Sequence, residues 1–299
     1  MELTWINKLR IAAVAALGIV VIGVLAWPLA APEDPMLPVR AWDISPAGSG
    51  MLLLLAFVLG FAGYFLAWPH GREIGILTVP FGLVIWAARS GPMRSLTQAY
   101  VEPFERAALI HSLRFEPVYW LLIVVAGFAG VLLAQYLRPT AEHAATIRKR
   151  KSYFGMNGYL DMLLAVAISV PVLQFSIGVF VQNLNMSDNA GAAQPAIGQI
   201  IFGVVAAFAV AGFAVKRFLN LGYVWPVVAS IFAMAIAEAV HYNAKAIQQF
   251  AEMRPATFFP HSIFAVLPVQ LVALGTIGSV IGYWTAVRYD YWRRHESAG

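Results

Sequence analysis

Eight long apolar stretches divide this chain of 299 residues, and they restrict the folds that are open to it. A helix needs about 20 consecutive apolar residues to cross a bilayer, because lipid offers no hydrogen-bond partner to a bare backbone. Charged residues make up only 12% of the chain, whereas a soluble domain carries about a quarter. The sequence therefore predicts an all-α fold, a bundle of eight transmembrane helices that forms a single integral membrane domain over residues 1–299.

The predicted spans are joined by short connections, which leave no room for a sizeable soluble domain. They cover residues 11–30, 51–68, 74–88, 118–137, 159–181, 197–215, 223–242 and 262–287. The third span is the shortest and contains Pro80. A tilted or partly re-entrant segment is expected there.

The distribution of basic residues predicts the orientation of the chain in the membrane. With the amino terminus inside, 13 of the 20 Lys and Arg residues lie on the inner side and 7 on the outer side. Cytoplasmic loops carry the excess of Lys and Arg. We therefore expect both termini in the cytoplasm and the protein in the cytoplasmic membrane. The net charge of +5 is read as a topology signal, and no nucleic-acid partner is expected.

Two loops have distinctive patterns. Residues 138–157 form a predicted cytoplasmic loop, whose densest basic run is Arg148, Lys149, Arg150 and Lys151. This run either attracts anionic lipid headgroups or an acidic partner, or simply orients the flanking spans. Residues 91–117 form a predicted extracytoplasmic loop, and its apolar residues recur at intervals close to those of one helix face. We expect Pro103 to split it into two short amphipathic helices on the membrane surface.

Glu238 and His241 are ionisable residues in the predicted seventh span. A charge at membrane depth is costly, so ionisable residues there often have a functional role. They lie three residues apart and so share one helical face. The same outer side holds His111, Glu116 and His261, which predicts a composite metal site with Glu238 and His241 as its first ligands. The alternative is a simple Glu–His hydrogen bond near the outer interface.

Asp161 and Gln174 are polar residues of the predicted fifth span, and Pro171 lies between them. A helix broken at Pro171 would expose carbonyl groups that can bind a cation or a substrate. Asp161 and Gln174 are therefore transport candidates. The alternative is that Asp161 is stabilised by the dipole at the start of the helix.

Glycine motifs recur along the spans. The tetrapeptide Gly-Phe-Ala-Gly occupies residues 60–63 and again residues 127–130. A partial echo at 212–215 suggests an internal repeat, as in some transporters. Gly278 and Gly282 form a small-xxx-small pair in the eighth span. Such glycines are typical of closely packed membrane helices.

Three functions are compatible with this pattern. The chain has no cysteine, which excludes disulfides and thiolate chemistry. It also lacks the sequence motifs of nucleophile elbows, zinc proteases and nucleotide-binding loops. The scarcity of charge within the spans and the abundance of glycine and aromatic residues favour a non-enzymatic helical subunit or scaffold of a membrane assembly, with other membrane subunits as partners. The alternatives are a small-molecule or ion transporter or channel that uses the proline-containing spans, and a membrane enzyme or metal site on the outer face around Glu238 and His241. No cofactor is indicated.

Overall fold

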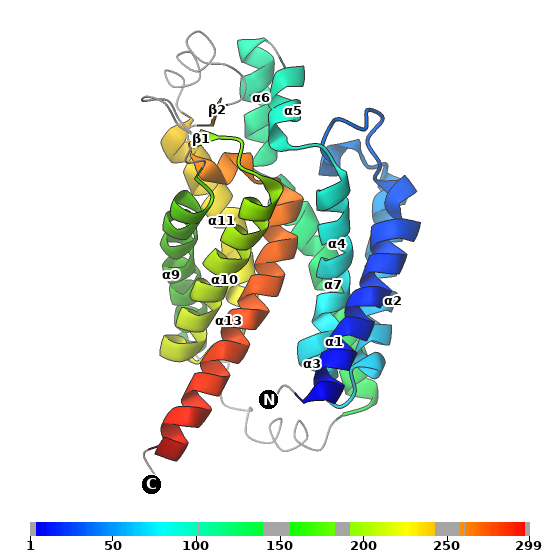
Figure 1. Cartoon of the computed structure of the whole chain (residues 1–299), viewed down its shortest axis with the longest axis vertical. Coiled ribbons are helices and arrows are strands. Elements are labelled where there is room, and N and C mark those ends of the chain that lie inside the picture. The colour runs from blue at the N-terminus through cyan, green and yellow to red at the C-terminus, as the bar shows by residue number, and fades with distance from the viewer. Residues whose placement is uncertain are drawn as a thin grey trace.

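The protein is a helical bundle, seen in a computed structural model that describes residues 4–100, 102–139, 156–182, 192–242, 258–259 and 261–296. Eight helices in this part of the chain are long and apolar enough to cross a membrane. They run roughly along the long axis of the molecule (Figure 1). The predicted all-α architecture with eight candidate spans is confirmed, and it is consistent with a multi-pass integral membrane protein.

The spans consist of α1 (Trp5–Gly18) with η1 (Ile19–Leu25), α2 (Pro46–Leu66), α3 (Gly71–Ile74) with η4 (Gly75–Leu77) and α4 (Thr78–Arg89), α7 (Glu116–Leu137), α9 (Met156–Phe180), α10 (Ile197–Leu219), α11 (Val224–His241) and α13 (Pro268–Glu296). The shorter elements are η2 (Trp27–Leu29), η3 (Ala41–Asp43), α5 (Met93–Ala99), α6 (Pro103–Leu113), β1 (Ala192–Ala193), β2 (Phe258–Phe259) and η6 (Ser262–Ala265). The two strands pair antiparallel.

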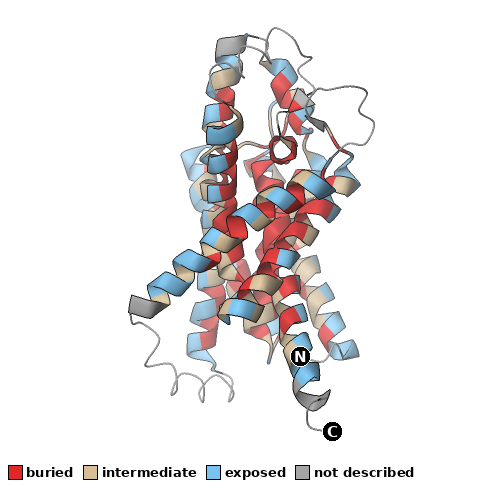
Figure 2. Ribbon diagram, turned by 90° about the vertical axis from the view of Figure 1, so that its left-hand side faces the viewer, coloured by how far each residue is buried: buried red, intermediate tan, exposed pale blue. Residues whose placement is uncertain are grey.

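The spans fall into two groups along the sequence. Helices α1, α2, α4 and α7 form one side of the bundle, and α9, α10, α11 and α13 form the other (Figure 1). Helix α13 joins the groups, because it packs on α4 and α7 as well as on α10 and α11. It is also the most buried span, and the buried residues follow the inner faces of the helices (Figure 2). One apolar core therefore runs through both groups.

The two ends of the bundle differ. Both chain termini lie at one end, which we call the terminal end (Figure 1). At the other end lie α5, α6, η6 and the β1–β2 pair, which together we call the end cap. Placement of both termini at one end is the arrangement that an even number of spans requires.

Glycines set the two most extensive helix contacts, α2 with α7 and α10 with α13. A Cβ added to Gly60 would overlap the carbonyl oxygen of Gly127, and one added to Gly130 would overlap that of Phe57. On α13, a Cβ on Gly282 would overlap the carbonyl oxygen of Ala209. The recurring Gly-Phe-Ala-Gly tetrapeptides thus meet each other across the α2–α7 contact. Close backbone packing, as expected for small residues in membrane helices, accounts for them.

The first and third spans each depart from a regular α-helix. The first span continues from α1 into the π-helical segment η1, and the carbonyl of Ile22 accepts a hydrogen bond from Trp86 Nε1 at 2.7 Å. The wider helix turn leaves carbonyl groups open to such side-chain donors. The third span is built from α3, η4 and α4 in sequence. Pro80 lies in the first turn of α4, where the missing N–H leaves no bond unmade.

The prediction that Pro171 breaks the fifth span is wrong. Helix α9 continues through Pro171 as one helix. Proline removes one backbone hydrogen bond, but in a packed membrane helix neighbouring helices and Ser or Thr side chains offset that loss. Pro226 lies in the first turn of α11, as Pro80 does in α4.

The loop of residues 91–117 contains the two short helices that were predicted, α5 and α6, and Pro103 begins the second of them. Their apolar residues Leu96, Leu109 and Leu113 are buried against the rest of the protein. Their placement on a membrane surface stays a prediction. Most of the basic loop 138–157, with Arg148–Lys151, lies outside the described residues.

Candidate functional site

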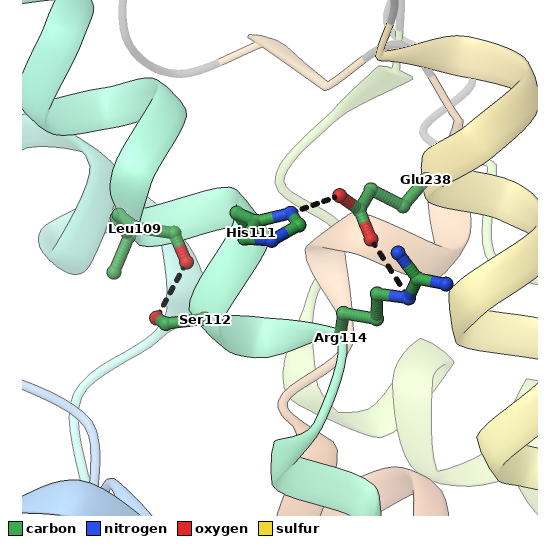
Figure 3. Close-up of polar contacts among 5 residues, drawn as sticks. All are labelled: Leu109, His111, Ser112, Arg114 and Glu238. Atoms are coloured by element: carbon green, nitrogen blue, oxygen red, sulfur yellow. Dashed lines mark hydrogen bonds and ion pairs between the residues drawn. The ribbon is translucent and has the colours of Figure 1, made fainter.

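The carboxylate of Glu238 is the centre of the polar contacts at the end cap (Figure 3). It projects from α11 toward α6, and its side chain is only 13% exposed. Oε1 lies 2.9 Å from Nδ1 of His111, and Oε2 lies 3.6 Å from Nε of Arg114. The first contact is a hydrogen bond, and the second is an ion pair too long for one. We call this set of three residues the Glu238 clasp, because it fastens α6 to α11.

His111 turns Nδ1 toward Glu238, and the rest of its side chain is mostly exposed. Its other ring nitrogen, Nε2, takes no part in this contact with Glu238.

His241, one turn beyond Glu238, contacts a second histidine. Its ring stacks on that of His261, with centroids 5.0 Å apart and planes 20° apart. His261 lies outside the spanning helices, and its Nδ1 accepts a hydrogen bond from the backbone N–H of Ile263 at 3.2 Å at the start of η6. Burial, followed by the neighbouring His241, lowers the pKa of His261. The ring is therefore held in its neutral form, with the proton on Nε2.

The structure brings together the residues proposed as a composite metal site, but in two pairs: His111 with Glu238, and His241 with His261. In the described part of the chain, no group of three or more His, Cys, Asp or Glu side chains is placed to hold a metal ion. A metal at His261 would compete with the bond to Ile263, because that bond uses the Nδ1 lone pair and fixes the proton on Nε2. The metal site stays a prediction.

A second polar contact, which the sequence did not suggest, joins Arg40 to Glu116. Glu116 begins α7 and is 1% exposed, and its Oε1 lies 3.8 Å from Nε of Arg40. Arg40 also donates from a terminal guanidinium nitrogen to the hydroxyl of Tyr100 at 2.8 Å. Sequence reasoning placed Glu116 on the outer side, but no spacing links it to a loop arginine far earlier in the chain.

The surroundings of Glu116 explain how a carboxylate is tolerated there. It occupies the first turn of α7, where the helix dipole favours a negative charge. Neither of its oxygens has a hydrogen-bond partner among the described residues, and the same holds for the indole N–H of Trp120, one turn further along α7. Because Glu116 relies on Arg40 and the dipole, loss of Arg40 would leave it without a counter-charge.

The two transport candidates lie apart. The amide nitrogen of Gln174 donates to the carbonyl of Ala233 at 3.1 Å and so joins α9 to α11. Asp161 is exposed near the start of α9. The difference of 13 positions places it about 20 Å away along the helix axis. The structure does not bring the two side chains together, and their role in transport stays a prediction.

A cavity of about 230 Å³ lies where the end cap meets the spans. Its lining includes Ser90, Met93, Gln194, Ala265 and Gln270. Gln194 crosses between elements, since it accepts from the backbone N–H of Arg94 and donates to the carbonyl of Ala265. The polar side chains at this wall thus help to hold the end cap in place.

Comparison with known protein families, with curated proteins and with solved structures finds no match to this chain.

Proposed function

We propose that the protein is a non-enzymatic helical subunit or scaffold of an assembly in the cytoplasmic membrane, with both termini in the cytoplasm and the end cap outside. The excess of Lys and Arg on the side of the termini supports this orientation. The end cap is then the part of the molecule that a partner meets on the outer face.

The observation that carries the proposal is the Glu238 clasp. Both oxygens of this carboxylate face cations or donors of the same chain, His111 on one side and Arg114 on the other. The nearby polar groups Gln174 and Gln194 are likewise bonded to backbone atoms of neighbouring elements. Side chains that could serve chemistry are used to hold helices and cap together. Such use favours a rigid structural part over a reaction centre.

Purification in mild detergent followed by native mass spectrometry tests the proposal. We expect the spectrum of the wild-type protein to show a complex of defined stoichiometry that is heavier than the 32.6 kDa chain. Glu238→Gln removes the charge that holds Arg114, so the end cap should loosen and less of the complex should survive.

Glu105→Gln is the matched control, because Glu105 is an exposed carboxylate on α6 itself. It should leave the complex intact. A wild-type protein that runs only as a lone chain without any partner would refute the assembly role.

A further inference from the structure

The cavity of about 230 Å³ at the end cap lies between the two groups of spans. Its walls come from the last turn of α4, the start of α5 and the start of α10, together with η6 and the first turn of α13. These elements meet at the end of the bundle that carries the end cap (Figure 1). Sites for small molecules often form in this way, between the helices of a bundle.

Gln270 is a buried polar residue of this cavity whose side chain is held in one orientation. It is the third residue of α13 and is 4% exposed, and its Oε1 accepts a hydrogen bond from the backbone N–H of Leu267 at 3.0 Å. Leu267 directly precedes the helix, so this bond is one half of a capping box. Because the carboxamide oxygen faces the Leu267 N–H, the amide nitrogen turns away from it.

The amide nitrogen of Gln270 has no hydrogen-bond acceptor within the described part of the chain. It carries two N–H donors. A buried donor without a protein partner is unfavourable, and such a group often marks the place where a ligand or water binds. Because Gln270 lines the cavity, these two donors are what its side chain offers to an occupant.

The rest of the wall is neutral and largely apolar. Met93, Ile197 and Ile200 line it, and no described lining residue carries a charge. Ser90 adds a hydroxyl whose own hydrogen bond, to the carbonyl of Ala87, is long at 3.5 Å. A charged occupant would lose its hydration without gaining a counter-charge, so the wall favours a neutral one.

The volume of the cavity limits the size of its occupant. An apolar cavity of about 150 Å³ holds one benzene molecule. On the same scale, the cavity of about 230 Å³ holds about nine heavy atoms. Ile197 lines the cavity and is 48% exposed, so this wall reaches the molecular surface at the start of α10.

We propose that this cavity, which we call the Gln270 pocket, binds a small neutral molecule that has an apolar body of ring size and a carbonyl oxygen. The carbonyl accepts a hydrogen bond from Nε2 of Gln270, and the apolar body lies against Met93 and Ile200. Such a group comes either from a free molecule or from the head of a lipid whose tail leaves past Ile197 along α10. Both sources present the same carbonyl to Gln270.

Saturation-transfer NMR of the full-length protein in detergent, titrated with two probes, tests this inference. Acetophenone is an aryl ketone of the expected size, and α-methylstyrene has the same shape with a CH₂ group in place of the carbonyl oxygen. We expect saturable binding of acetophenone by the wild type, with a preference of about tenfold over α-methylstyrene, the worth of one neutral hydrogen bond.

Gln270→Met keeps the length of the side chain and removes the donor. The preference for acetophenone should disappear in this variant, and partition of the probes into detergent cancels because it is the same for both proteins. Gln98→Met is the matched control, since Gln98 is an exposed glutamine of α5 outside the described lining. It should keep the wild-type preference.

Ile197→Trp keeps the test decisive if Gln270→Met folds poorly, because it changes a half-exposed side chain at the first position of α10. The larger ring should narrow the pocket and weaken both probes together. No saturable binding of acetophenone by the wild type, an unchanged preference in Gln270→Met, or unchanged affinity for both probes in Ile197→Trp would overturn the proposal.

Dodecanophenone, an aryl ketone with a long alkyl chain, separates the two sources of the ligand. If its binding is saturable and is weakened by Gln270→Met, the pocket takes the head of a lipid. If only acetophenone depends on Gln270, the pocket takes a free molecule.

Discussion

Replacement of Gly60 by valine is expected to force α2 and α7 apart and to cause one of the largest losses of stability of any single substitution in the spans. Even a Cβ at this position would overlap the carbonyl oxygen of Gly127. Neither atom can rotate away, since the carbonyl oxygen belongs to the backbone and the backbone fixes the position of a Cβ. Overpacking against side chains costs about 1–3 kcal/mol, and a clash with backbone should exceed that range.

Unfolding in detergent, followed by helical circular dichroism during an SDS titration, measures this loss. Gly50→Val is the matched control on the same helix, because no atom lies within 4 Å of a Cβ added there. It tests the general effect of a β-branched residue in α2. If Gly60→Val and Gly50→Val unfold at the same SDS fraction, the close α2–α7 contact is not what stabilises this side of the bundle.

Arg40→Gln is expected to produce the second large effect. It leaves the buried carboxylate of Glu116 without its positive partner. Removal of one member of a buried ion pair costs about 3–5 kcal/mol, because the remaining charge stays uncompensated. The thermal unfolding midpoint in a fixed detergent should fall accordingly, whereas Arg94→Gln on the exposed face of the end cap should leave it nearly unchanged.

The double variant Arg40→Gln with Glu116→Gln separates the ion pair from other effects of the substitution. It removes the stranded charge, so it should be more stable than Arg40→Gln alone. Glu116→Gln alone should cost less than Arg40→Gln, since Arg40 is partly exposed and water can reach it. Simple addition of the two single losses would show that Arg40 and Glu116 do not stabilise each other.

The features that the sequence predicts well are those with a local cause. Each span follows from its own apolar composition, and the two short helices around Pro103 follow from helical spacing and one proline. The role of Gly278 and Gly282 can also be predicted from the local sequence, because small residues at this spacing in a span are typical of close helix packing. The structure places both against backbone of α10.

The features that the sequence does not predict depend on which faces of the helices are turned toward one another. Nothing local connects Arg40 with Glu116, because the pair joins segments far apart in the chain. The prediction of a break at Pro171 fails for a related reason. A proline breaks an isolated helix, but the packing of α9 on α10 and α11 keeps helix α9 continuous. The sequence predicts the shared face of Glu238 and His241 and suggests His111 and His261 as their partners, but it does not predict that the four residues form two separate pairs.

Cysteine labelling in intact cells tests most directly whether the eight spans separate an outer end cap from a cytoplasmic end that holds both termini. The natural chain has no cysteine, so single variants need no background removed. An impermeant maleimide should label Glu102→Cys in the end cap at once, and should label Ser297→Cys near the carboxyl terminus only after the cells are permeabilised. Labelling of Ser297→Cys in intact cells would contradict the account.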